Sequence, residues 1–325
     1  MKAIRIHEFG SADKLVYEDI PVPAIADNQL LVKLESTSVN HLDMKRASGG
    51  NFGKDRTVLP WIPGHEFAGI VDSVGKSVTG FHKGDKVYGN CNGGSYAEYL
   101  AADTDKTVLM PDNLSFDEAA SVPHVGETAW QAIHIHGQLR EGQKVLVHGA
   151  AGGVGAYAVQ FAHRLGAVVY ATSSHDDMEF VKSLGADEVI DYKKTDFTTV
   201  YKDLDLVLSL VGGDTEERSY QILKKGGRLV STVGISKPDK AESQGITAIG
   251  MVVKQSAEDL QKISDLLQSG AVKTDIAIKF ALKDAAKGWK TLSGDSSVPR
   301  IGHGKIILGV TDKIIKVKSG DKYTL

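Results

Sequence analysis

Short apolar and alternating runs, separated by glycine-containing turns, fill the chain from Met1 to about Leu109. Strands are the expected elements, because period-two alternation and β-branched residues favour them. The runs are Lys2–His7, Leu30–Glu35, Phe67–Val74, Lys86–Tyr88 and Tyr96–Ala101. The glycines between them are typical of tight turns. This part of the chain therefore predicts a compact β-barrel-like domain.

After Ser115 the pattern changes to an alternation of strands and helices, which lasts until about Gly270. The expected elements are Lys144–His148, Val154–Leu165, Ala167–Thr172, Met178–Leu184, Glu188–Asp191, Asp205–Leu210, Glu216–Leu223, Gly227–Val233 and Glu258–Gln268. Such alternation predicts a parallel sheet with helices on both faces. From Ile276 strands and turns return and end in Gly304–Val310, whereas the polar stretch Ser236–Gly245 is expected to be a mobile loop.

These patterns predict an α/β protein of two domains. Its 325 residues are about twice the usual size of one domain. We expect a Rossmann-type domain at residues 121–270, inserted into a barrel domain made of residues 1–120 and 271–325.

The strongest chemical signal is a glycine-rich loop within KVLVHGAAGGVGAYAVQFAHRLGA, residues 144–167. A strand leads into the loop and a helix leaves it, which is the context of a dinucleotide-binding fingerprint. Gly152 is expected to let the backbone approach a pyrophosphate, and Gly155 to let the helix pack against the strand. Ala150 replaces the first glycine of the motif, which gives A-x-G-x-x-G. Because the N-terminus of a helix attracts phosphate, the loop predicts a dinucleotide site.

The end of the next strand, Ser173-Ser174-His175, bears on which dinucleotide binds. NAD enzymes usually place an acid there, which holds the ribose hydroxyls and repels the extra phosphate of NADP. Two hydroxyls and an imidazole suit a 2′-phosphate, so we expect NADPH. Asp176 is the nearest acid, and NADH is the alternative if its carboxylate reaches inward.

Composition narrows the function classes. Cys91 is the sole cysteine, which excludes an internal disulfide and a Cys-rich zinc or iron–sulfur cluster. A formal net charge of −3 gives no field that would gather nucleic acid, so nucleic-acid binding is disfavoured. No apolar run reaches the roughly 18 residues of a spanning helix, and no signal peptide is evident. We expect a cytoplasmic enzyme that does not enter the membrane.

Nearly the whole chain carries motifs that occur in one order: MKAIRIHEFG, PWIPGHEFAGIVDSVGKSV, FHKGDKVYG, GGSYAEY, GETAWQAI, VHGAAGGVG, LGADEVIDY and GKIILG. In these motifs the chain resembles the medium-chain dehydrogenase/reductase superfamily and, within it, the zinc-free quinone oxidoreductase branch. The resemblance implies a GroES-like β-barrel domain plus a Rossmann-type, doubly wound parallel sheet domain. It is much more specific for the fold than for the substrate.

Zinc enzymes of this superfamily hold their catalytic metal with a cysteine before a helix, the histidine of a Gly-His-Glu motif and a third cysteine or acid. Asn40 stands at the first of these positions here, and a neutral amide is a poor zinc ligand. We therefore expect no metal. A zinc site stays as the alternative, because His41, Asp43 and His65 are a chemically feasible set of ligands.

The resemblance also implies contacts with the cofactor. Residues at the pyrophosphate are Ala151, Gly152, Gly153 and Val154, and residues at the adenosine ribose or its phosphate are Ser173, Ser174 and Tyr192, beside His175. Residues on the nicotinamide side are Asn40, Lys45, Thr128, Val233, Gly234, Ile235 and Ser236.

Hydride transfer from NADPH to a quinone or an α,β-unsaturated carbonyl is the expected reaction, because electron-poor acceptors need mainly alignment and stabilisation of a developing oxyanion. The catalytic candidates are Asn40, His41, Asp43 and His65, and none stands out as an acid. Alternatives are an enoyl reductase or a zinc-type alcohol dehydrogenase on the same fold, and an NADPH-binding protein with a mainly non-enzymatic role. The resemblance implies a homodimer joined through sheet edges, for which Ala248–Val253 is the candidate strand.

Overall fold

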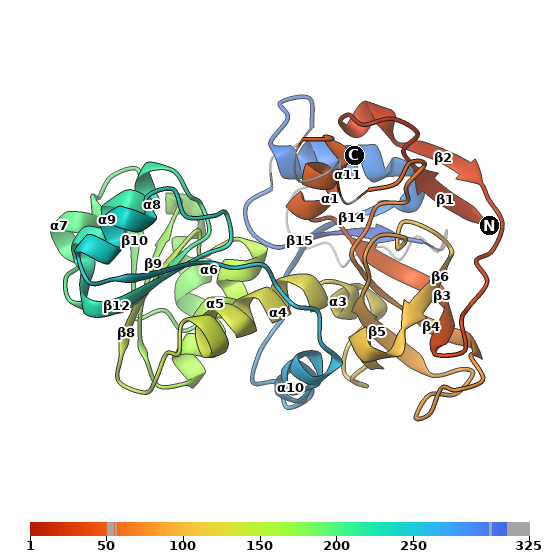
Figure 1. Cartoon of the computed structure of the whole chain (residues 1–325), viewed down its shortest axis with the longest axis horizontal. Helices are drawn as coiled ribbons and strands as arrows, with labels where there is room; N and C mark the ends of the chain where they lie inside the picture. The colour runs from red at the N-terminus through yellow and green to blue at the C-terminus, as the bar shows by residue number, and fades with distance from the viewer. Residues whose placement is uncertain (51–54, 56, 299–300, 311–325) are drawn as a thin grey trace.

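The computed structural model describes residues 1–50, 55, 57–298 and 301–310, so residues 311–325 of the predicted barrel domain lie outside the described residues. Two sheets dominate it, and each gathers helices around itself (Figure 1). The N-terminal segment and the last strands share one of these groups, at the right of Figure 1, while the middle of the chain forms the other. This is the insertion that the change of pattern along the sequence predicts.

The first sheet has seven strands within the described residues, in the order β14-β15-β3-β4-β5-β7, with β6 paired to β3. Its strands are β3 (Gln29–Ser38), β4 (Glu66–Val74), β5 (Lys86–Asn90), β6 (Tyr99–Asp103), β7 (Thr107–Leu109), β14 (Ile276–Ala281) and β15 (Lys305–Gly309). A separate hairpin pairs β1 (Lys2–Arg5) with β2 (Val16–Asp19). Because β15 pairs antiparallel with β3, the last described strand completes the barrel part that the N-terminal strands begin.

The second sheet is parallel, with the strand order β10-β9-β8-β11-β12-β13. Its strands are β8 (Lys144–His148), β9 (Val168–Ser173), β10 (Glu188–Asp191), β11 (Leu204–Ser209), β12 (Leu223–Ser231) and β13 (Thr247–Gly250). In β8, Val145 and Val147 enter one apolar cluster and Leu146 enters another, so both faces of the sheet are covered. The chain reverses direction across the sheet between β8 and β11, which is where doubly wound folds bind ligands. β13, which covers the beginning of the predicted strand Ala248–Val253, lies at one edge of the sheet, and β10 lies at the other.

Helices fill the space on and between the sheets. They are α1 (His41–Ala47), α3 (Phe116–Ala120), α4 (Pro123–Trp130), α5 (Gly153–Arg164), α6 (Met178–Ser183), α7 (Phe197–Val200), α8 (Asp214–Ser219), α9 (Pro238–Ser243), α10 (Ala257–Gln268) and α11 (Ala285–Ser293), with a π-helical turn at Gln131–His136. Short 3-10 turns occur at Ala12–Lys14, Thr104–Lys106, His175–Asp177, Tyr220–Ile222 and Leu282–Asp284. No helix in the described part of the chain is long and apolar enough to cross a membrane.

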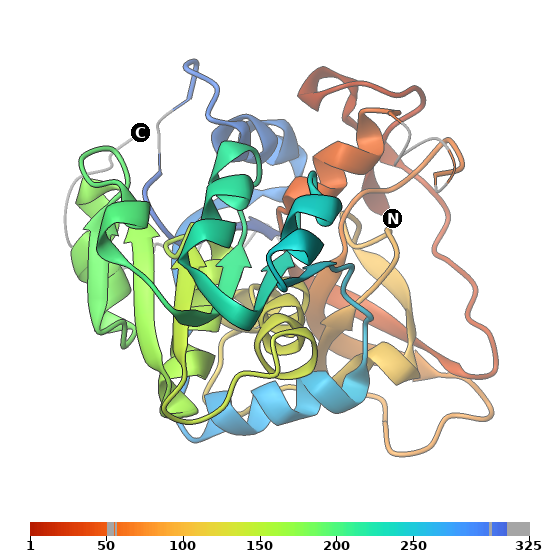
Figure 2. The same ribbon diagram turned by 60° about the vertical axis from the view of Figure 1, so that its left-hand side comes forward.

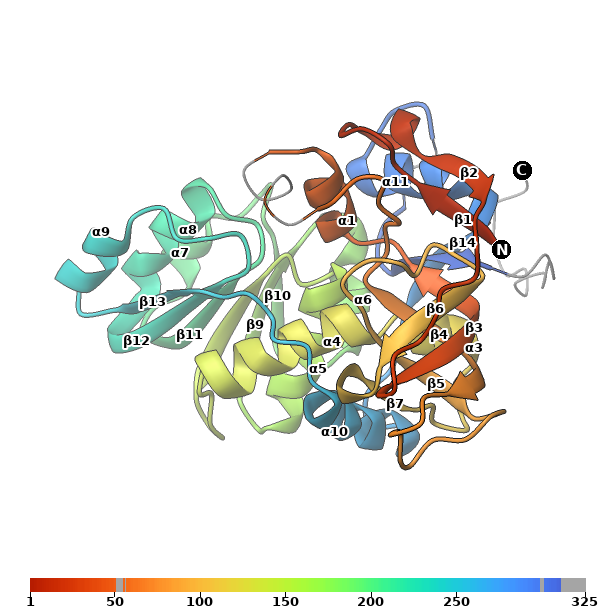
Figure 3. The same ribbon diagram turned by 45° about the vertical axis from the view of Figure 1, so that its right-hand side comes forward.

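α4 and α10 supply contacts between the two groups of elements; α4 runs between the sheets in Figure 3, and α10 lies below α4 in Figures 2 and 3. The Tyr88 hydroxyl of β5 is hydrogen-bonded to the Ser264 hydroxyl of α10, and α10 also packs against α4. Both helices lie close in sequence to the expected domain boundaries near residues 120 and 270. The division into domains at these residues stays a prediction.

Two expectations for local structure were wrong. The stretch 236–245 contains α9, whose first residue is Pro238 and whose Ala241 is buried. Proline suits the first turn of a helix, because its missing N–H would have no partner there. The segment after Ile276 contains α11, with Ala285, Gly288 and Trp289 buried on one face. Their spacing is helical, and the surrounding strands hid it.

Candidate active site

The glycine-rich loop joins β8 to α5 as predicted. A Cβ atom at Gly155 would lie 2.3 Å from the carbonyl oxygen of Gly149, so only glycine allows this approach of helix to strand. Gly149 has φ +69°, a conformation that favours glycine. A Cβ atom at Gly152 would have nothing nearer than 3.4 Å, so the backbone there faces open space. The loop therefore has the packing and the accessible backbone that a pyrophosphate site needs.

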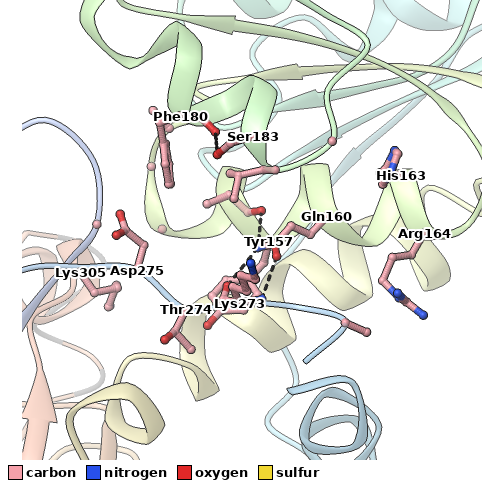
Figure 4. A pocket seen from close by; sticks show the side chains of 18 residues that line it. Tyr157, Gln160, His163, Arg164, Phe180, Ser183, Lys273, Thr274, Asp275 and Lys305 are labelled. Atoms are coloured by element: carbon pink, nitrogen blue, oxygen red, sulfur yellow. Dashed lines mark hydrogen bonds between the residues drawn. The ribbon is translucent and has the colours of Figure 1, made fainter. Parts of the chain in front are cut away.

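A cavity of about 400 Å³ adjoins this loop. Figure 4 shows its walls, with Phe180 and Ser183 of α6 on one side and Lys273 and Thr274 on the other. Gln160 of α5 fixes the second wall, because its side chain is bonded to the backbone of Lys273 in both directions, at 3.1 and 2.8 Å. Lys305 lies at the end of the cavity near the loop.

Lys305 connects the loop to the barrel part. A Cβ atom at Gly153 would lie 3.2 Å from its Cδ, so its side chain passes directly by the loop. Its buried ammonium donates to Asn40 Oδ1 at 2.7 Å and to Glu66 Oε1 at 2.9 Å. Asn40 Nδ2 also donates to Glu66 Oε1, at 2.7 Å. Lys305, Asn40 and Glu66, here called the Lys305 cluster, therefore place a positive charge between the glycine loop and the start of α1.

Glu66 is fully buried at the start of β4. Burial alone would raise the pKa of its carboxyl. The charge of Lys305, the neighbouring His124 and hydrogen bonds from Ser38 and Asn40 outweigh burial and hold that pKa below its ordinary value. Glu66 is therefore an ionised partner for Lys305.

His65 and Asp43, two of the catalytic candidates, are bonded to each other inside the barrel part. His65 Nδ1 lies 2.5 Å from Asp43 Oδ1, and Arg46 Nη1 lies 3.0 Å from His65 Nε2. Since an arginine only donates, Nε2 accepts and Nδ1 carries the hydrogen. Asp43 also accepts hydrogen bonds from the backbone N–H of Asn40 and Gly64 and from the Tyr96 hydroxyl. Both side chains are almost without exposed surface, and their hydrogen bonds hold the start of α1 against Gly64 and His65.

The remaining candidates lie around the Lys305 cluster and the carboxyl ends of the parallel strands. His41 and Lys45 are exposed on α1. Thr128 is buried on α4 and donates its hydroxyl to the carbonyl of His124 at 2.6 Å. Val233 and Gly234 are exposed after β12, beside the partly buried Ile235. Ser236 donates its hydroxyl and its backbone N–H to Glu216, so its polar groups already have partners.

At the end of β9, Ser173 is buried and donates to the carbonyl oxygen of Ser174 at 2.9 Å. Ser174 donates its hydroxyl to Asp177 Oδ2 at 2.6 Å. His175 is exposed, as is Tyr192 beyond β10. Asp177 is thus the acid that contacts Ser174, whereas Asp176, the acid of the NADH alternative, is exposed.

Comparison with known proteins gives the family. Residues 26–112 match the model of the alcohol dehydrogenase GroES-like domain, and residues 184–308 match the model of the zinc-binding dehydrogenases. The chain is 38% identical to 2-methylene-furan-3-one reductase of Solanum lycopersicum over 84% of this chain and 70% of that protein. The quinone oxidoreductase of Coxiella burnetii superposes with a TM-score of 0.89 and 32% identity, covering 96% of this chain and 99% of the other.

The chain belongs to the medium-chain dehydrogenase/reductase superfamily. A second solved structure that the chain resembles is the Escherichia coli quinone oxidoreductase complexed with NADPH. It superposes with a TM-score of 0.86 and 26% identity, covering 95% of this chain and all of the other. The resemblance read from the sequence motifs is confirmed, and so is the GroES-like plus Rossmann-type fold.

The donor set bears on the zinc that many members of this superfamily carry. His41, Asp43 and His65 were the alternative ligands. His65 has both ring nitrogens engaged and Asp43 has both oxygens engaged, so neither has a free lone pair directed at a shared ion. In the described part of the chain, no three His, Cys, Asp or Glu side chains are grouped as a metal would require. Instead the Lys305 ammonium contacts Asn40, the residue at the usual cysteine position.

Three residues of this site were missed by sequence reasoning: Glu66, His124 and Lys305. Glu66 and Lys305 were visible in the Gly-His-Glu and Gly-Lys motifs of the superfamily, but no role had been attached to them. His124 carried the signal of a polar ring directly after Pro123, at the start of a helix. Nothing local indicated that the three would meet, because they come from β4, α4 and β15.

Proposed function

We propose that the protein is an NADPH-dependent oxidoreductase that transfers hydride to a quinone or an α,β-unsaturated carbonyl and works without zinc. The observation that carries the proposal is the Lys305 cluster, which joins the dinucleotide loop to Asn40 through one buried ammonium. Relatives named for furan-one and quinone reduction support the substrate class.

The residues present fit a dinucleotide. The backbone at Gly152 is open, α5 directs its N-terminus to the loop, and Lys305 adds positive charge beside Gly153. Ala151, Gly152, Gly153 and Val154 would hold the pyrophosphate, while Ser173, Ser174, His175 and Tyr192 would border the adenosine ribose and its phosphate. NADPH, when bound, supplies the hydride. Asn40, Lys45, Thr128 and the segment Val233–Ser236 would face the nicotinamide half.

The chain's own residues would align the reactants. Asn40 is fixed by Lys305, by Glu66 and by its backbone N–H bond to Asp43, so its amide cannot turn freely. A preorganised polar group of this kind stabilises developing charge without reorganisation. An enone or quinone needs no metal to polarise it, because it is already electron-poor.

Zinc independence follows from the donor set in this proposal. A zinc ion at Asn40 and His65 would need the Arg46 and Lys305 contacts to break, and it would meet an amide and an ammonium in place of thiolates. We further propose the domain division at residues 1–120 with 271–325 and 121–270, a homodimer formed through β13, and a cytoplasmic location.

The test is NADPH consumption at 340 nm with a panel of quinones, enals, enones and simple aldehydes. The proposal predicts turnover with quinones or enones and none with saturated aldehydes. Activity restricted to saturated aldehydes would favour a zinc-type alcohol dehydrogenase, and NADPH binding without turnover would favour a non-enzymatic role.

A further inference from the structure

His124 is an ionisable side chain beside the Lys305 cluster that the proposed reaction leaves without a role. It is the second residue of α4, and its backbone N–H donates to Glu66 Oε2 at 2.7 Å. The other oxygen of the same carboxylate holds Asn40. One turn further along α4, Thr128 donates to the His124 carbonyl. His124 is therefore linked through Glu66 to Asn40 and through its own carbonyl to Thr128, two of the residues expected on the nicotinamide side.

The surroundings of the ring decide which nitrogen carries hydrogen. Nδ1 of His124 is enclosed and has no hydrogen-bond partner. Nε2 is not enclosed in this way, and the residue is partly exposed, so Nε2 is the ring nitrogen on the accessible side. An enclosed N–H without an acceptor is rarer and costlier than an enclosed acceptor without a donor. The neutral ring therefore keeps its hydrogen on Nε2, where it can donate to a group in the site.

Electrostatics keep this ring neutral. The pKa of His124 is lowered to about 4, and burial is the main cause. The charges of His65 and Lys305 also lower it, whereas the charges of Glu66 and Asp43 raise it. Protonation would also create an enclosed N–H without an acceptor, at Nδ1. Over the pH range near neutrality, His124 is consequently a hydrogen-bond donor that does not give up its proton, a role for which neutral imidazole is suited.

We propose that the Nε2–H of His124 donates a hydrogen bond to the carbonyl oxygen of the acceptor and so makes His124 a catalytic residue for the reduction. The inference rests on the proposed function. Hydride adds to the β carbon with two electrons, the π electrons of the alkene and carbonyl shift to the oxygen, and the cofactor is left oxidised. A proton from water then completes the product at the α carbon, and His124 keeps its own proton throughout.

Amide substitutions separate the two ring nitrogens. In His124→Gln the side-chain amide nitrogen reaches about where Nε2 was, whereas in His124→Asn it reaches about where Nδ1 was. Both are neutral and polar, and His124→Leu removes the donor altogether. The same changes at His82, whose side chain is 83% exposed in the turn between β4 and β5, serve as matched controls. Fluorescence titration of NADPH and circular dichroism show whether each variant folds and binds cofactor.

We expect His124→Gln to retain kcat with an enone to within about tenfold, and His124→Asn and His124→Leu to lose on the order of 100-fold or more, as for the loss of one oxyanion donor. NADPH affinity stays unchanged in all three. A second readout needs no turnover: with NADP⁺ present, the absorption band of bound 4-dimethylaminocinnamaldehyde shifts to the red in the wild type and in His124→Gln, and not in the other two.

If His124→Gln and His124→Asn have the same kcat and the same red shift, the inference is contradicted while the proposed function stays intact. A His41→Gln variant that alone abolishes the red shift contradicts the inference too, since it would assign the donor to α1. If His124→Leu does not fold, the Gln and Asn pair decides. A wild type that reduces no acceptor contradicts the proposed function itself, and the inference falls with it.

Discussion

Glu127 makes the stability of the folded protein depend on pH, and the size of this effect can be calculated. Its carboxyl is fully buried on α4, where Oε2 accepts from Asn90 Nδ2 at 2.9 Å and Oε1 accepts from the backbone N–H of Ser256 at 3.2 Å. Burial, with smaller contributions from the charges of Asp259 and Glu66, raises the pKa of Glu127 from 4.5 to about 8. The folded protein therefore keeps a proton on Glu127 at neutral pH.

The sign and size of the effect follow from proton linkage. Between pH 4.5 and about 8 the folded state holds a proton that the unfolded chain has released, so the free energy of unfolding falls as pH rises through this range. Each pH unit in the interval costs about 1.4 kcal/mol, so the whole interval of about 3.5 units costs about 5 kcal/mol. Glu127→Gln removes the titration and can also donate an amide hydrogen to Asn90 Oδ1, which is enclosed without a partner.

Urea denaturation of the wild type and Glu127→Gln, followed by tryptophan fluorescence at pH 5, 6, 7 and 8, measures this difference. The variant should gain stability over the wild type progressively with pH, with the largest difference at pH 8. Glu242→Gln, at an exposed position on α9, is the control and should run parallel to the wild type. Parallel curves for the wild type and Glu127→Gln would refute the reasoning.

Three further substitutions test other parts of the structure. Gly155→Ala should destabilise the protein by about 2 kcal/mol in thermal unfolding, because its Cβ collides with the Gly149 backbone; an unchanged melting temperature would contradict the packing described. Lys305→Met should lower the free energy of unfolding in urea by about 3 to 5 kcal/mol, because it leaves the buried carboxylate of Glu66 unpaired. Adding Glu66→Gln to the same chain should restore much of the lost stability. No restoration would mean that the broken ion pair is not the cause. In fluorescence titrations Asp177→Asn should tighten the binding of NADPH several-fold without tightening the binding of NADH, because it removes a carboxylate next to Ser174. Glu179→Gln is the control and should change the affinity for neither cofactor. Equal effects on both cofactors would show that Asp177 is remote from the 2′-phosphate.

Local signals explain what the sequence predicted well. The glycine loop, the alternation of strands and helices and the edge strand β13 depend on short stretches whose pattern survives folding. Gly155 packs against the backbone of Gly149 and Ala150, directly after β8. The helices α9 and α11 were missed because polar or strand-like neighbours obscured a short amphipathic pattern.

The chemistry of the site depends on contacts that no local pattern carries. Lys305 meets Asn40 from 265 positions away and Glu66 from 239. His65 was a plausible ligand or acid from its motif, yet Arg46 and Asp43 occupy both of its nitrogens. Only the three-dimensional structure shows that His65 is engaged while the neighbouring His124 keeps one ring nitrogen accessible.

The central claim is hydride transfer without zinc, and one measurement addresses it directly. Protein purified without chelator is analysed for metal and then assayed for NADPH oxidation with an enone and a quinone, before and after dialysis against a chelator. We expect no bound zinc and an unchanged rate after dialysis. One zinc per chain, together with activity that is lost on dialysis and regained with zinc, would contradict it.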